Sequence, residues 1–190
     1  MKHKPSPMKI TRKTALQSLF GAFITLPALA KSQQMKDLTS FKEEFLPAWK
    51  RSMDYTLAVF NQMPEEKLDF KYTPESFSFR TQFVHCINFT AGQISGRFGV
   101  KDPYEKPTKP WKDLTKAELA TEIKGFYAWI EKVVKETPAA KLLEMENFAG
   151  DGIPKWRFFY AMENHIIHHR GQAICYVRLC GVTPESYVGW

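Results

Sequence analysis

The sequence is poor in cysteine, and the few cysteines it has show no pairing pattern. Cys86, Cys175 and Cys180 are the only three, and no two of them stand in a C-x-x-C spacing. An odd number of cysteines cannot all pair within one chain, and no spacing here favours a particular disulfide. We therefore expect no disulfide framework, and we interpret the three residues as small side chains buried on helices.

Long apolar runs are also missing. The most apolar stretch, residues 15–26, is shorter than the ~20 residues of a membrane span, Gln17 interrupts it and Pro27 follows it. A basic segment ends just before it at Arg12-Lys13, and Ala28-Leu29-Ala30 supplies the small residues of a cleavage site. We predict that residues 1–30 form a signal peptide and residues 31–190 a mature domain without a transmembrane span. The protein is then periplasmic or extracellular, and Sec export is favoured over the twin-arginine route.

The positive charge of the chain does not extend over its length. The formal net charge is +7, but five of the 27 basic residues and none of the 20 acidic residues lie in residues 1–30. The rest of the chain therefore has a net charge of about +2, without the basic surface that nucleic-acid binding requires. We expect no nucleic-acid partner.

Apolar residues at steps of three and four recur in four stretches, and runs with the two-residue period of strands are absent. Ser40–Glu43 and Thr115–Glu118 are capping boxes that mark two helix starts. At this length one domain is expected, so the pattern predicts an all-α fold: a four-helix bundle over about residues 39–182, either up-down-up-down or with one long crossover. The predicted helices cover about residues 40–63, 79–98, 115–136 and 155–180.

The connections follow from proline and glycine. Residues 64–74 and 102–111 are predicted to be loops, the second of them long for a bundle. Residues 138–154 contain Gly150-Asp151-Gly152, a turn signal, and are expected to form a short crossing loop or a hairpin. Pro154 then suits the first turn of the last helix.

Histidines occupy core positions of the last helix, where Leu or Ile would be expected. His165 and His169 stand roughly 40° apart around the helix and about 6 Å apart along it, so they can bind one metal ion. His168 is also one turn from His165, and spacing alone leaves open which residue is the second ligand; two satisfied core histidines remain the alternative to a metal. The apolar stripe that contains these positions consists of Phe158, Met162, His165, His169, Gln172, Tyr176 and Leu179.

His85 is the lone histidine of the second helix. It shares a side with Gln82, Phe89, Gly92 and Gly96, and the glycines there would allow another backbone to come close. Pattern alone favours a satisfied core histidine. No general base stands out either, because Glu163 precedes His165 by two residues and so lies on the far side of the helix; Arg170 and Arg178 are expected at the surface.

The run His165–Gln172 with the residues after it reads H-x-x-H-H-R-G-Q-x-x-x-Y-x-R-x-x-G-x-x-P. It resembles the last helix of the DinB-like (DinB/YfiT-type) metal-binding four-helix-bundle proteins, and the likeness covers roughly residues 41–187. In that family the first and last histidines of H-x-x-H-H are metal ligands, and a third comes from the second helix. The resemblance therefore implies a site of His85, His165 and His169, with His168 outside it.

The resemblance also implies a range of functions. Together with the predicted signal peptide, it favours an exported protein that binds a divalent metal ion, zinc or nickel before others, and that acts as a metal-dependent, in some relatives thiol-dependent, transferase or hydrolase. The alternative is a non-catalytic metal-binding or stress-associated bundle. The substrate is an unidentified small molecule, and the expectation allows for a homodimer.

Overall fold

The computed structural model describes the backbone of residues 12–188 and the side chains of residues 31–188. The chain divides into two compact units, residues 1–39 and residues 40–190. Helix α1, Arg12–Gln62, begins in the first unit and ends in the second. The predicted signal peptide, residues 1–30, lies outside the residues whose side chains are described.

The predicted helix start at Ser40 is wrong. Ser40 and Glu43 lie inside α1, so neither caps a helix end, and Pro47 lies in the interior of the helix rather than in its first turn. The physical reason is that residues 31–39 contain no glycine or proline that would stop a helix before Ser40. A capping-box pattern marks a start only where the preceding residues leave the helical conformation.

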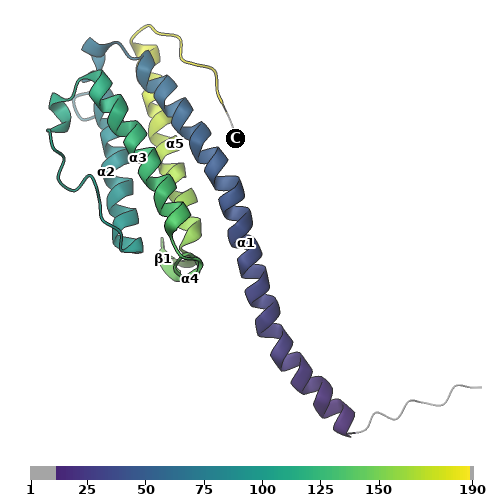
Figure 1. Cartoon of the computed structure of the whole chain (residues 1–190). Helices are drawn as coiled ribbons and strands as arrows, with labels where there is room; N and C mark the ends of the chain where they lie inside the picture. The colour runs from purple at the N-terminus through teal and green to yellow at the C-terminus, as the bar shows by residue number, and fades with distance from the viewer. Residues whose placement is uncertain (1–11, 189–190) are drawn as a thin grey trace, which may run out of the picture. The chain divides into compact units, whose positions relative to one another are not determined.

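The second unit is an all-α bundle, as predicted. Its long helices are the C-terminal part of α1 together with α2, Phe79–Phe98, α3, Lys116–Glu136, and α5, Trp156–Leu179 (Figure 1). Ser78 caps α2 by accepting a hydrogen bond from the backbone N–H of Thr81, and Thr115 and Glu118 form the predicted capping box of α3. Within the described part of the chain, no helix is long and apolar enough to cross a membrane.

The bundle contains the long crossover that was one of the two predicted topologies. Lys116 Nζ donates to Met63 O at 2.7 Å, so the start of α3 lies at the end of α1. Arg80 Nη1 donates to Leu114 O at 2.6 Å, so the starts of α2 and α3 lie together. Helices α2 and α3 are therefore parallel. The segment that links them, residues 99–115, runs back along the bundle from the end of α2 to the start of α3, as Figure 1 shows.

The predicted loops contain short elements. Residues 65–67 and residues 111–113 form 3-10 helices. Helix α4 (Ala139–Leu143) comes before a β-hairpin, whose two strands are β1 (Met145–Phe148) and β2 (Asp151–Pro154). The hairpin was one of the two expectations for this segment. Its turn is Ala149-Gly150, both with positive φ, as a two-residue hairpin turn requires. Pro154 ends β2 instead of opening the last helix, and Lys155 is the N-cap of α5.

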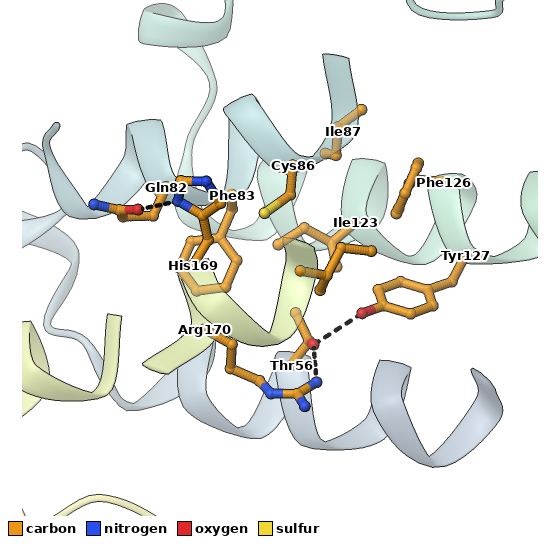
Figure 2. A pocket seen from close by; sticks show the side chains of 11 residues that line it. Thr56, Gln82, Phe83, Cys86, Ile87, Ile123, Phe126, Tyr127, His169 and Arg170 are labelled. Carbon is orange, nitrogen blue, oxygen red and sulfur yellow. Dashed lines mark hydrogen bonds between the residues drawn. The ribbon is translucent and has the colours of Figure 1, made fainter. Parts of the chain in front are cut away.

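A polar cluster lies inside the bundle and holds α5 against α1. Arg170 Nη1 donates to Ser52 Oγ and to Thr56 Oγ1, each at 3.0 Å. The hydroxyls of Thr56 and of Tyr127 in α3 share a hydrogen bond of 2.9 Å, and Figure 2 shows Thr56 between Arg170 and Tyr127. The expectation that Arg170 is a surface residue is therefore wrong, because its side chain finds enough hydrogen-bond acceptors to be buried. Arg178, in contrast, is exposed as expected.

Candidate metal centre

Three histidines from two helices converge at the α2–α5 interface. His165 Nε2 lies 3.2 Å from His85 Nε2 and 3.1 Å from His169 Nε2. His169 is buried, whereas His85 and His165 are half-buried. These residues form the one group of potential metal ligands found among residues 31–188, with ligand atoms within 4.8 Å of one another. The three candidates from the sequence thus meet at one point.

The spacing of these nitrogens fits a metal ion. A tetrahedral zinc ion with Zn–N bonds of 2.0–2.1 Å holds its ligand nitrogens about 3.3 Å apart. The two measured separations, 3.2 and 3.1 Å, are close to that value. Two of the three separations in the group thus match a bound ion, and the third lies within 4.8 Å.

Gln82 fixes the orientation of one imidazole. Its Oε1 lies 2.6 Å from His169 Nδ1, as Figure 2 shows, and accepts the Nδ1–H proton. The lone pair of His169 then resides on Nε2, the nitrogen that faces the other two histidines. Gln82 Nε2 in turn donates to Gln172 Oε1 at 3.1 Å, so the amide of Gln82 is itself oriented.

The helical pattern of the sequence places Gln82 on the side of His85 but indicates no role for it. Both residues lie on one face of α2, three positions apart, and that spacing is the only feature of the sequence that connects Gln82 with the histidine site. No comparable partner supports His165, since its Nδ1 is buried without a hydrogen-bond partner among the described residues.

The electrostatics of the cluster keep the imidazoles neutral. Burial, together with the neighbouring histidines, lowers the pKa of His169 to about 4. Burial also lowers the pKa of His85, and burial with His85 and His168 lowers that of His165. Neutral imidazole is the form that binds a metal ion, so all three are prepared as ligands near pH 7.

His168 and Cys86 lie outside the cluster. The His168 side chain is exposed, and its Nε2 accepts from Gln172 Nε2 at 2.7 Å. Cys86 faces the interior instead, beside Arg170 and Tyr127, where burial raises the pKa of its thiol to about 12 (Figure 2). Cys175 is exposed and Cys180 half-exposed, so the prediction that all three cysteines are buried is wrong.

The predicted close approach of another backbone at Gly92 and Gly96 is also wrong. A Cβ atom built at either residue would have no atom of another group within 4 Å. Both glycines are exposed, on the face of α2 that carries His85.

Comparison with known proteins agrees with the fold. The model of the DinB family matches residues 33–189. The chain belongs to the DinB family. The uncharacterized protein YrdA of Bacillus subtilis (strain 168) is 22% identical over 149 residues, which are 77% of this chain and 87% of YrdA.

Two solved structures of DinB-like proteins share the fold. One, from Bacillus cereus ATCC 10987, has a TM-score of 0.62 and 23% identity, and the match covers 77% of this chain and 97% of that chain. The other, YjoA from Bacillus subtilis, has a TM-score of 0.59 and 15% identity over 75% of this chain and 95% of its own. Membership of the DinB family and the histidine cluster are together compatible with metal binding.

Proposed function

We propose that this DinB-family protein is exported and binds one divalent metal ion through the Nε2 atoms of His85, His165 and His169. We further propose that it uses the ion as a metal-dependent transferase or hydrolase. The convergence of three neutral imidazoles, one of them oriented by Gln82, is the observation that supports metal binding. Zinc and nickel are the preferred candidates, because both bind imidazole well.

The number of ligands favours an enzyme over a structural metal site. Structural zinc sites usually have four protein ligands, whereas catalytic sites have three and leave one position for water or substrate. Among the described residues, the cluster consists of three histidines, and no further histidine, cysteine or carboxylate joins it. A bound ion would lower the pKa of a water or thiol at that position.

One observation weighs against a hydrolase. Glu163 is the acidic residue nearest to His165 in the sequence, yet it is buried on the other side of α5, where Ser52 and Arg170 interact with it. It cannot take a proton from a molecule at the histidines. A hydrolase would thus need a proton acceptor other than Glu163. A transferase whose thiol substrate would lose its proton on binding the metal would need no such acceptor.

Metal titration tests the proposal. Calorimetry of the purified, metal-free protein with zinc and nickel should give one ion per chain near pH 7. Because the pKa values of the three histidines are lowered, protons should compete only below the ordinary imidazole value of about 6.5, and binding should fade toward pH 4. Absence of stoichiometric binding of any divalent first-row ion at neutral pH would refute the metal site.

Export is proposed from the sequence features of residues 1–30. The basic segment, the apolar run and Ala28-Leu29-Ala30 together support a cleaved signal peptide. Protein recovered from the periplasm or the medium should begin near Lys31, as intact-mass measurement would show. Recovery of chains that still begin at Met1 would contradict cleavage.

A further inference from the structure

Two half-exposed phenyl rings flank the histidine cluster. The ring centroid of Phe77 lies 5.3 Å from that of His85 and 6.3 Å from that of His169. The ring of Phe89 lies 4.5 Å from His165 and 5.6 Å from His85. Phe77 remains 44% exposed and Phe89 40% exposed, although each contacts two histidines.

Both rings have a fixed backbone position. Phe89 follows His85 by one turn of α2, so the two side chains project from the same face. Phe77 precedes the N-cap Ser78, and its carbonyl oxygen accepts a hydrogen bond from the hydroxyl of Tyr176 in α5. Segments on both sides of His85 therefore hold an apolar surface beside the imidazole nitrogens.

The surface of α2 on the C-terminal side of Phe89 is not covered by other side chains. Gly92 and Gly96 continue the face of α2 that carries His85 and Phe89, and no atom of another group lies within 4 Å of a Cβ placed there. A glycine inside a helix costs about 1 kcal/mol relative to alanine, and close packing does not explain these two. They keep the approach to Phe89 and the histidines free of side chains.

We propose that the ligand of this site is a small molecule that joins a metal-binding oxygen or sulfur donor to an apolar, preferentially aromatic, group. The donor takes the open position on the ion, and the apolar group packs against Phe77 and Phe89. This inference rests on the proposed metal site. It deepens that function by naming two residues that determine specificity and the chemical class of the substrate.

The rings could instead serve only to shield the imidazoles from water. Shielding alone predicts that a bound donor gains nothing from an attached apolar group. Packing predicts a gain, because burial of a phenyl group against two aromatic rings corresponds to about a tenfold increase in affinity or more. The two roles are therefore separated by a pair of ligands that share one donor.

The test uses the zinc-loaded protein with acetohydroxamate and benzohydroxamate, which present the same donor with a methyl or a phenyl group. Calorimetry should show benzohydroxamate binding about tenfold more tightly or better. Phe77→Ala and Phe89→Ala should each reduce this ratio several-fold while zinc still binds with one ion per chain. Leu179→Ala removes an exposed apolar side chain from the end of α5 and should leave the ratio and the zinc affinity unchanged.

The outcomes separate the two proposals. Equal affinities of the two hydroxamates for the zinc-loaded wild-type protein would overturn the apolar subsite while the metal site stands. An unchanged ratio in both phenylalanine variants would also overturn it. Failure of the wild-type protein to bind zinc or nickel would overturn the metal site itself.

Discussion

Replacing His85, His165 or His169 by alanine is expected to abolish stoichiometric metal binding. Each change removes one of three converging Nε2 atoms, and the two ligands that remain hold an ion only weakly. Each should therefore lower zinc affinity by several orders of magnitude in a titration near pH 7. The helical circular dichroism of each variant should match that of the wild type, because the cluster lies at the surface-facing side of the α2–α5 interface.

His168→Ala is the matched control, since it removes an imidazole next to His169 that lies outside the cluster. Its Nε2 accepts from the amide of Gln172, and its ring lies 5.0 Å from that of His169, but it adds no ligand atom to the cluster, so zinc affinity should fall by a small factor at most. Gln82→Ala should have an intermediate effect, a loss of about 10- to 100-fold, because His169 would lose the acceptor that fixes its tautomer. Full affinity in His169→Ala together with lost affinity in His168→Ala would reverse the ligand assignment.

The helices and the local part of the site could be predicted from the sequence. Periodicity and turn residues gave the bounds of α2 and α3, because their caps, Ser78 and Thr115, lie beside loops that end the helical pattern. His165 and His169 are close in sequence, so helix geometry alone showed that they can share a ligand. His85 required the family resemblance, since nothing in the pattern of α2 indicates which helix it faces.

Contacts across the bundle could not be predicted in the same way. Gln82 supports His169 over a separation of 87 residues, and Arg170 finds Ser52 over 118 residues. Burial of a charged side chain depends on what the facing helix presents, and Ser52 and Thr56 look like ordinary small polar residues of α1. The Ser40–Glu43 capping pattern does not mark a helix start, because a helix that already includes the preceding residues continues through it.

Arg170→Ala is expected to cause a large loss of stability. The guanidinium is 6% exposed and donates to Ser52 Oγ and Thr56 Oγ1, and it lies 4.9 Å from the ring of Tyr55. Its charge also opposes the rise that burial causes in the pKa of Glu163. Truncation removes a charged donor from Ser52 and Thr56, which still hydrogen-bond to Tyr127, and it takes the nearby positive charge from the buried Glu163, so the free energy of unfolding should fall by about 3–5 kcal/mol.

Arg178→Ala provides the comparison, because Arg178 lies on the same helix but is exposed. Its effect should stay within about 0.5 kcal/mol of zero. Denaturant unfolding of both metal-free variants against the wild type measures the difference, and the thermal midpoint of Arg170→Ala should drop by about 10 °C. Arg170→Lys should recover only part of the loss, since an ammonium group can donate to the hydroxyls but does not place a planar guanidinium over the ring of Tyr55. Equal stabilities for Arg170→Ala and Arg178→Ala would show that the buried cluster does not hold α5 against α1. A large loss confined to Arg170→Ala would show that the residue following His169 anchors the helix that carries two of the three histidines.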